Sequence, residues 1–344
     1  MPVPPLLDEL LRAPGPSGQE ERPAAVWRAA AADFAEVSSD TLGTSVARVA
    51  GGGRGPSCAL IGHMDEIGFI ATHVDDQGFV SIRRVGGYNP EVLVGQRAEF
   101  LTGVRGVVAR RREQTPTSER KNARFEDLHV DIGARGGDEA KGLVRPGDVG
   151  VFAGEPVELR EGRLVSRALD NRLGCYVALE AARRVAGEAP GDVIAIAATQ
   201  EETGAHGVRS AVFDLEPDLA LVFDVTSTSD VPGADPREDG THDLGSGPTI
   251  LRGTIVHPRV AELLVECAQS AGIEYTLEVA GGVSMTDADA THLSRAGIPT
   301  GLVSIPLRYM HSPIELCDLG DVEAAIELTV AFLKRLEPGL SFAR

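Results

Sequence analysis

The sequence is poor in cysteine and contains no long apolar run. Its four cysteines are far apart and form neither CxxC pairs nor a dense framework: Cys58, Cys175, Cys267 and Cys317. This usage is typical of reduced, buried thiols in a cytoplasmic protein. No stretch of about 18 apolar residues is present, so we expect no membrane-spanning helix. The N-terminus, MPVPPLLDELLRAPGPSGQEER, has acids and prolines where a secretion signal needs a basic start, which argues against export.

Lysine is also scarce, because only three of the 33 basic residues are lysines: Lys121, Lys141 and Lys334. The formal net charge is −18, so the chain as a whole would repel nucleic acid and anionic membranes. We expect neither as a partner. The arginines are scattered rather than clustered, which indicates coding bias and not an arginine-rich binding surface.

The remaining composition is that of a folded globular protein. The 344 residues are 42% hydrophobic and 24% charged, far from the composition of disordered chains. This length exceeds the size at which a single core usually stops growing. We therefore expect one large domain carrying a smaller one, or two unequal domains.

Two kinds of pattern alternate along the chain. An amphipathic segment near 20–34 precedes a strand, a polar turn and a second strand at 57–74. From about 75 to 163, short β-like runs are separated by glycines, among them FVSIRRV, RAEFLTGV, RGVVARR and HVDIGA. Beyond Ser166, helices and strands alternate: helices near 172–186, 259–271 and 321–336, and strands at DVIAIAATQ, LALVFDV and TGLVSI.

This order predicts an α/β fold, namely a mixed-sheet α/β/α domain formed by residues 1–74 and 164–344. An all-β, barrel-like domain at 75–163 would be inserted into it. The segment 227–247, rich in Asp, Gly and Pro, is a long loop that could line a substrate cleft.

Polar residues end several apolar strand-like runs, where an open α/β sheet presents its binding crevice. These candidate site residues are His63, Asp170, Glu201, Glu202, Asp224 and His311. Histidine nitrogens and carboxylate oxygens without a thiolate suit zinc, cobalt or manganese in a hydrolytic site, and a carboxylate can bridge two ions. The pattern therefore indicates a dinuclear metal centre.

Five ordered motifs closely resemble the tetrahedral (TET) aminopeptidases of the glutamyl aminopeptidase and "cellulase M" family: GHMDEIGF, RALDNRLGC, TQEETGAHG, VFDVT and SIPLRYMHSPIE. The segments LLRAPGPSGQEE, GGYNPEVLVGQR and VDIGARGGDEAKGLVRPGD also resemble that family, so the similarity spans nearly the whole chain. The resemblance implies a metal-dependent aminopeptidase that acts on short peptides. It also implies assembly into a hollow dodecamer with inward-facing active sites, the inserted β domain serving oligomerisation.

The resemblance also assigns a role to each residue. His63, Asp170 and Asp224 would bind one divalent ion, and Asp170, Glu202 and His311 the other, with zinc or cobalt favoured and manganese open. Glu201 would be the general base, because adjacent side chains diverge and only one of the two glutamates can face the attacking water while the other binds metal.

Asp65 is the second expected catalytic residue. It follows His63 by two positions, where it could accept a hydrogen bond from the other ring nitrogen and fix the tautomer. We read Glu66 as structural. Asp287 aligns with a Thr-Asp-Ala element of the family, and His206 lies where the family more often has arginine, but neither receives a role.

Three alternatives to an aminopeptidase function can be considered, and the sequence argues against each of them. A metal-dependent deacylase or carboxypeptidase of related fold would be expected to carry a helix-bearing lid in place of the β insert. A glycosidase would leave the metal-type histidines unused. A non-catalytic assembly or binding relative would be expected to have lost at least one ligand. The N-terminal residue preference is open, with a general or neutral-hydrophobic preference as the default.

Overall fold

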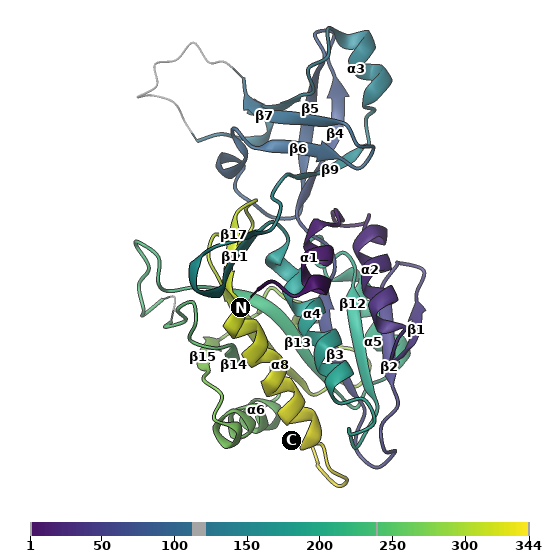
Figure 1. Ribbon diagram of the computed structural model, residues 1–344, viewed down its shortest axis with the longest axis vertical. Coiled ribbons are helices and arrows are strands. Elements are labelled where there is room, and N and C mark those ends of the chain that lie inside the picture. Colours follow the sequence, from purple (N-terminus) through teal and green to yellow (C-terminus); the bar gives the residue numbers. More distant parts are fainter. Residues whose placement is uncertain (1, 112–121, 239, 343–344) are drawn as a thin grey trace.

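The computed structural model describes residues 2–111, 122–238 and 240–342. It consists of a large α/β part and a smaller β-barrel that projects from it (Figure 1). The helices are α1 (Pro5–Arg12), α2 (Glu21–Ala31), α3 (Gly137–Leu143), α4 (Leu169–Arg184), α5 (His206–Leu215), α6 (Pro258–Ala271), α7 (Ala288–Thr291) and α8 (Leu319–Lys334). No helix within these described residues is both long enough and apolar enough to span a membrane.

An eight-stranded mixed sheet organises the large part, in the order β1-β2-β12-β3-β13-β16-β14-β15. Its strands are β1 (Glu36–Ser39), β2 (Ser45–Val49), β3 (Cys58–His63), β12 (Val193–Ala198), β13 (Leu219–Ser227), β14 (Thr249–Gly253), β15 (Thr276–Ala280) and β16 (Thr300–Leu307). The central strands β12, β3, β13 and β16 run parallel to one another, so their carboxyl ends reach the same edge of the sheet.

Alternating side chains of the central strands bury both faces of this sheet. On β3, Leu60 packs into the core beneath α1, α2, α4, α6 and α8, whereas Ile61 packs into the core beneath α5 and α7. Successive side chains of a strand point to opposite faces, so a strand covered on both sides must be apolar throughout. The runs CALIG and VIAIAA meet this demand, and the large part is an α/β/α sandwich (Figure 1).

Helix α4 approaches β3 unusually closely. A Cβ atom on Gly62 would lie only 2.4 Å from the backbone nitrogen of Cys175. This distance is too short for any side chain, so the position requires glycine. Glycine therefore lets the first turns of α4 rest directly on the end of β3, beside His63. This contact brings the start of α4 to the strand-end edge.

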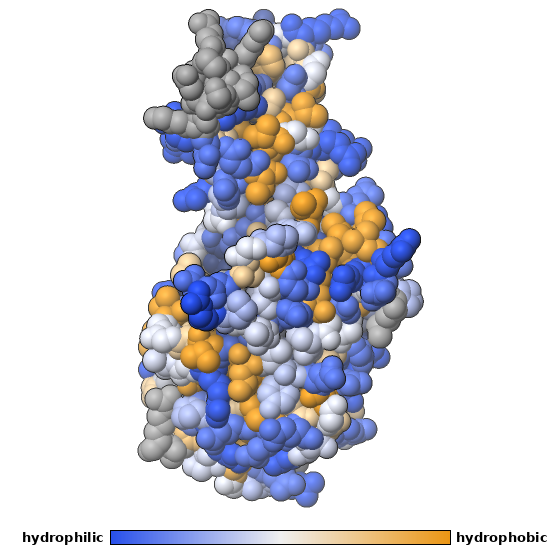
Figure 2. Space-filling model, turned by 90° about the vertical axis from the view of Figure 1, so that its left-hand side faces the viewer, coloured by the Kyte–Doolittle hydropathy of each residue, from blue (hydrophilic) through white to orange (hydrophobic). Residues whose placement is uncertain are grey.

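The smaller part is a closed barrel of the order β4-β5-β8-β7-β6-β9. Its strands are β4 (Gly68–Val74), β5 (Phe79–Val85), β6 (Arg97–Phe100), β7 (Arg105–Arg110), β8 (Leu128–Asp131) and β9 (Val149–Phe152). A core of its own fills the barrel, centred on Phe69, Phe100 and Phe152. The face shown in Figure 2 is mostly hydrophilic, with apolar side chains in scattered patches.

A third, three-stranded sheet of β10 (Val157–Glu158), β11 (Arg163–Ser166) and β17 (Glu315–Asp318) lies where the chain returns from the barrel. Short 3₁₀ helices occupy Pro90–Leu93, Phe125–Asp127 and Arg160–Gly162. The sheet matters for the site because β17 begins at Glu315, close to the loop that carries His311.

The predicted fold class is confirmed, and most elements lie within a few residues of their expected bounds. The barrel differs from the expected segment 75–163 at both ends, because β4 at 68–74 is already a barrel strand and β10 and β11 pair with β17 instead. Hydrophobic alternation predicts a strand but not the sheet it joins, which explains the displaced boundary. Several elements were not anticipated: helices α1, α3, α5 and α7 and strands β1, β2, β9, β14, β15 and β17. Residues 112–121, which include Lys121, lie within the predicted insert but outside the described residues.

Candidate metal centre

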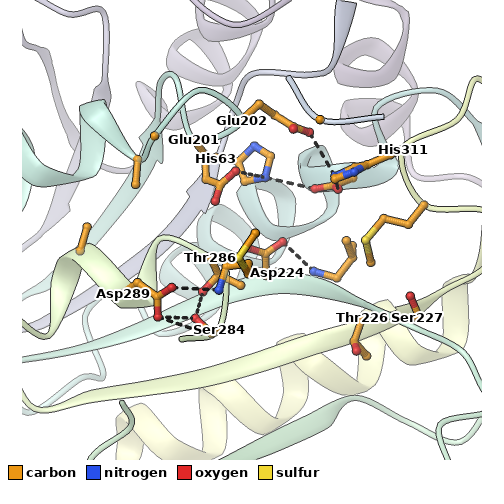
Figure 3. Close-up of a pocket in the computed structure, with 18 of the residues that line it drawn as sticks. His63, Glu201, Glu202, Asp224, Thr226, Ser227, Ser284, Thr286, Asp289 and His311 are labelled. Carbon is orange, nitrogen blue, oxygen red and sulfur yellow. Dashed lines mark hydrogen bonds and ion pairs between the residues drawn. The ribbon is translucent and has the colours of Figure 1, made fainter. Parts of the chain in front are cut away.

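The six candidate site residues converge on one cleft, although one of them, Asp170, does not lie at the end of a strand. His63 ends β3, Glu201 and Glu202 follow β12, Asp224 lies near the end of β13, and His311 follows β16. Asp170 comes from the other side, at the start of α4. All six line a cleft of about 660 Å³. Figure 3 labels five of them, namely His63, Glu201, Glu202, Asp224 and His311. Parallel strands bring their carboxyl ends to the same edge, which is why residues so distant in sequence meet here.

Asp170 lies between the two histidines. Its Oδ1 atom is 3.1 Å from Nε2 of His63, and its Oδ2 atom is 3.2 Å from Nε2 of His311. The two carboxylate oxygens therefore diverge toward different imidazoles. This is the geometry in which one carboxylate can contact two neighbouring ions.

Two groups of side chains could each hold a metal ion. His63, Asp170 and Asp224 form one, and Asp170, Glu202 and His311 the other, with the ligand atoms of each group within 4.8 Å of one another. The donors are imidazole nitrogens and carboxylate oxygens, which suits divalent transition metals. Among the described residues, the buried Oε1 atom of Glu202 has no hydrogen-bond partner, as expected for a group shaped to bind a cation. The residues present therefore fit a metal pair.

The electrostatics of the site also favour cations. Burial, together with the nearby charge of Asp170, raises the pKa of Glu202 and Asp224 well above the ordinary carboxyl value. Burial alone would raise the pKa of Asp170 too, but its bonds to His311 and His63 lower it. Crowded carboxylates disfavour each other's ionisation, and a divalent cation between them reverses that effect.

Glu201 and Glu202 point in different directions, as expected for adjacent residues. Oε1 of Glu202 is 3.6 Å from Nε2 of His311, whereas Oε2 of Glu201 is 3.8 Å from Nε2 of His63. The Glu201 side chain is the more exposed of the two, at 14% against 4%. Burial, Asp170 and Asp65 raise the pKa of Glu201 to about 7, although His63 opposes the shift.

Two oxygens of Asp65 lie near Nδ1 of His63. Nδ1 of His63 lies 3.2 Å from the backbone carbonyl oxygen of Asp65, within hydrogen-bond distance. The Oδ1 atom of the Asp65 carboxylate lies 3.4 Å from the same nitrogen. Both acceptors favour a proton on Nδ1, which would leave Nε2 free to bind a metal.

The Asp65 carboxylate has a second set of partners that the sequence did not reveal. Oδ1 accepts a 3.0 Å hydrogen bond from the backbone amide of Glu201, and Oδ2 accepts a 3.1 Å bond from that of Glu202. The Ser17 hydroxyl donates to Oδ2 at 2.6 Å. Next along the loop, the amide of Gln200 donates to the buried Glu20 side chain at 3.1 Å. Three successive amides are thus held by two buried carboxylates.

Left-handed backbone occurs beside several site residues. Ala168 precedes Asp170 by two positions with φ of 58°, and Gln200 directly precedes Glu201 with φ of 58°. His311 itself has φ of 58°. Residues other than glycine rarely adopt this conformation, and it clusters at functional sites whose surroundings hold it in place.

The remaining residues considered from the sequence lie outside the two metal groups. Glu66 is buried and pairs with Arg167 and Arg172, so it is structural. His206 is exposed and its Nδ1 atom lies 3.1 Å from the Gln200 side chain. Asp287 is 1% exposed, and both its carboxyl oxygens lack a hydrogen-bond partner within the described structure. From the 227–247 loop, Ser227 and Glu238 line the cleft.

Comparison with known proteins finds close similarity over most of the chain. Residues 43–328 match the model of the M42 glutamyl aminopeptidase family. A relative from Acetivibrio thermocellus named "Putative aminopeptidase" is 38% identical over 300 residues, covering 86% of this chain and 87% of that protein. The "Lysyl aminopeptidase" of Pyrococcus furiosus is 33% identical over 312 residues, covering 88% of each.

Solved structures show the same fold. The TET aminopeptidase of the marine sediment archaeon Thaumarchaeota archaeon SCGC AB-539-E09 superposes with a TM-score of 0.91 at 34% identity, covering 96% of both chains. The Pyrococcus horikoshii TET1 peptidase, which can assemble into a tetrahedron or a large octahedral shell, superposes with a TM-score of 0.81 at 29% identity. That match covers 95% of this chain and 98% of the other.

Proposed function

Because this chain belongs to the M42 glutamyl aminopeptidase family and is thus a metal-dependent aminopeptidase, we propose that it removes N-terminal residues from short peptides by means of two divalent ions in the cleft. The family is the one that the five motifs resemble. The observation that carries the dinuclear proposal is the position of Asp170, whose two oxygens face His63 and His311 at 3.1 and 3.2 Å.

His63, Asp170 and Asp224 would hold one ion, and Asp170, Glu202 and His311 the other. The close spacing of the ligand atoms in each group supports this division. Asp170 would serve both ions. The donor set favours zinc or cobalt, with manganese possible. When bound, such ions polarise the carbonyl of the scissile bond and acidify water.

Glu201 would be the general base. It belongs to neither ligand group, it reaches the centre of the cleft beside His63, and its raised pKa of about 7 suits proton transfer near neutral pH. Glu201 would accept a proton from the attacking water and later donate it to the leaving amine. Asp65 would act through the backbone of Glu201 and Glu202, keeping both side chains in position.

We further propose that the chain forms a large closed oligomer, a dodecamer, with the inserted β domain contributing to assembly and the α/β part to catalysis. The assembly of the TET1 relative supports this proposal. An enclosed active site would restrict substrates to short, unfolded peptides. Light scattering on the metal-loaded protein tests it, because a stable monomer would contradict it.

The four cysteines are all buried and unpaired, which supports a location in the reducing cytoplasm. Fractionation of the native cells would test this location, because recovery of the protein outside the cytoplasmic fraction would contradict it.

The decisive experiment compares aminoacyl anilides with their N-acetylated forms. Protein stripped with a chelator is given zinc, cobalt or manganese, and hydrolysis is measured for each substrate. Metal-restored cleavage of only the free-amine substrates is the expected result. Cleavage of only the blocked substrates would indicate a deacylase, and no cleavage with any metal would indicate a non-catalytic relative.

A further inference from the structure

Glu278 is a carboxylate of the same cleft that belongs to neither ligand group. It lies on β15, at the edge of the large sheet. The Thr226 hydroxyl donates a 3.2 Å hydrogen bond to its Oε1 atom, and the Thr249 hydroxyl donates a 3.3 Å bond to its Oε2 atom. Each carboxylate oxygen thus has a fixed neutral donor. A carboxylate held in this way has a defined place in the cleft.

The register of the sheet places this carboxylate close to the proposed centre. Asp224 and Thr226 are two residues apart on β13, so their side chains share a face and lie about 6.6 Å apart along the strand. Asp224 pairs with Ser304 on β16, and Ser304 pairs with Thr249 on β14. The Glu278 carboxylate, which joins the two threonines, therefore lies over β16, one strand away from Asp224. Figure 3 shows Asp224 and Thr226 along the same wall of the cleft.

Glu278 lacks a cationic partner among the residues that the structure describes, since its hydrogen-bond donors there are hydroxyls. A buried or half-buried carboxylate bound only to hydroxyls keeps its negative charge available to a ligand. A primary ammonium group is the natural complement, because it carries one positive charge and three donors.

The other charged groups of the cleft wall, outside the proposed metal centre, differ from Glu278 in their contacts or exposure. The Asp289 carboxylate accepts hydrogen bonds from the backbone amides of Ser284 and Met285, and these bonds stabilise the loop that precedes it. Figure 3 shows Asp289 beside Ser284. Glu238 and Arg209 line the cleft with exposed side chains. Arg209 is a cation that would favour an acidic group, so its effect opposes that of Glu278 and must be separated from it by experiment.

We propose that Glu278 determines specificity by binding the side-chain ammonium group of an N-terminal lysine-like residue, so that peptides with a cationic N-terminal residue are the preferred substrates. This inference rests on the proposed aminopeptidase function. The α-amino group of any substrate must lie beside the scissile carbonyl, at the centre formed by Asp170 and Glu201. Glu278, one strand away, is within reach of the four-carbon stem of lysine.

The first test measures kcat/KM for lysyl, leucyl and glutamyl anilides with the metal-loaded protein and with the Glu278→Gln variant. Glutamine keeps the shape of the side chain and one acceptor oxygen. We expect the wild-type protein to prefer the lysyl substrate and the variant to lose about tenfold to hundredfold on that substrate alone. The Glu238→Gln variant, which removes the same charge from another position in the cleft, should keep the lysyl preference.

Three results would overturn the inference. An equal loss on all three substrates would show that Glu278 binds a group common to them or supports the fold. No loss on the lysyl substrate would show that it binds nothing. A wild-type preference for the glutamyl substrate would assign specificity to Arg209 instead.

A binding measurement separates this inference from the proposed function. L-lysine and L-norleucine have the same unbranched stem, but only lysine carries the terminal ammonium group. Calorimetric titration of the metal-loaded protein should show lysine binding at least about tenfold more tightly, and Glu278→Gln should remove the difference. Tighter lysine binding without hydrolysis of any anilide would refute the proposed function and the substrate preference, but not the binding of an ammonium group by Glu278. Hydrolysis with equal binding of lysine and norleucine would refute this inference alone.

Discussion

The side chain of Glu315 accepts a 3.1 Å hydrogen bond from the backbone amide of Asp170. Its other carboxylate oxygen accepts a 3.0 Å bond from the backbone amide of His311. Glu315 is 1% exposed and begins β17, so one buried carboxylate joins the start of α4 to the loop after β16. Asp65 likewise accepts hydrogen bonds from the backbone amides of Glu201 and Glu202.

Substitution of Glu315 should therefore weaken metal binding although the residue is not a ligand. Glu315→Gln leaves one acceptor oxygen and turns the other into a donor that faces a backbone N–H group. We expect the affinity for the ion held by Asp170, Glu202 and His311 to fall about tenfold to hundredfold. Metal titration of the stripped protein measures this loss.

The matched control is Glu323→Gln, which removes a carboxylate that pairs with Arg184 on the surface of α8. Its metal affinity should equal that of the wild-type protein. If Glu315→Gln also bound metal like the wild type, the backbone bonds of Glu315 would not position the ligands.

The shared position of Asp170 predicts different metal contents for two ligand variants. His311→Ala removes a ligand from one group only, so the protein should retain about one ion per chain. Asp170→Ala removes a ligand from both groups and should leave less than one. Elemental analysis after dialysis against a limited metal concentration measures the ratio. Equal losses in the two variants would contradict a carboxylate shared by both ions.

Glu201→Gln should separate catalysis from metal binding. The variant keeps the size of the side chain but cannot accept a proton, so kcat should fall by about 10²–10⁴. Metal content should stay unchanged, because Glu201 is absent from both ligand groups. A parallel loss of metal would make Glu201 a ligand instead, and an unchanged kcat would transfer the role of base to another group.

The sequence predicted the parts of the site that follow from strand position. A polar residue that ends an apolar strand must lie at the sheet edge, so the meeting of His63, Glu202 and Asp224 could be foreseen. The family resemblance supplied their division into two groups, which remains a prediction. The α/β/α class was predicted for the same reason, since runs such as VIAIAA can only be buried on both faces.

The supporting groups could not be predicted in the same way. Glu20, Asp65 and Glu315 accept hydrogen bonds from backbone amides, and any residue except proline can donate such a bond. The side-chain type of the donor residue therefore does not indicate that its backbone amide binds a carboxylate. The place of Glu278 in the cleft could not be predicted for a related reason. Its position on an edge strand and its threonine donors depend on the order of strands in the sheet.

The protonation of Glu20 should make folding stability depend on pH. Burial, together with the charge of Asp65, raises the pKa of this carboxyl from its ordinary value of 4.5 to about 7, although hydrogen bonds from Gly18 and Gln200 oppose the shift. The folded chain therefore holds a proton that the unfolded chain releases between about pH 4.5 and 7. The contribution of Glu20 to the free energy of unfolding is present in full below pH 4.5 and is lost as pH rises toward 7.

Glu20→Gln provides the comparison, because glutamine does not ionise and retains an acceptor oxygen for the amides of Gly18 and Gln200. The free energy of unfolding of the variant should be most similar to that of the wild type near pH 4. At pH 7.5 it should exceed the wild-type value by up to about 3 kcal/mol. Denaturant unfolding of both proteins in chelator, at several pH values, measures the difference without a contribution from metal release. A difference that is constant from pH 4 to pH 7.5 would show that Glu20 does not titrate in this range, and its carboxylate would then be held ionised by the loop that carries Glu201.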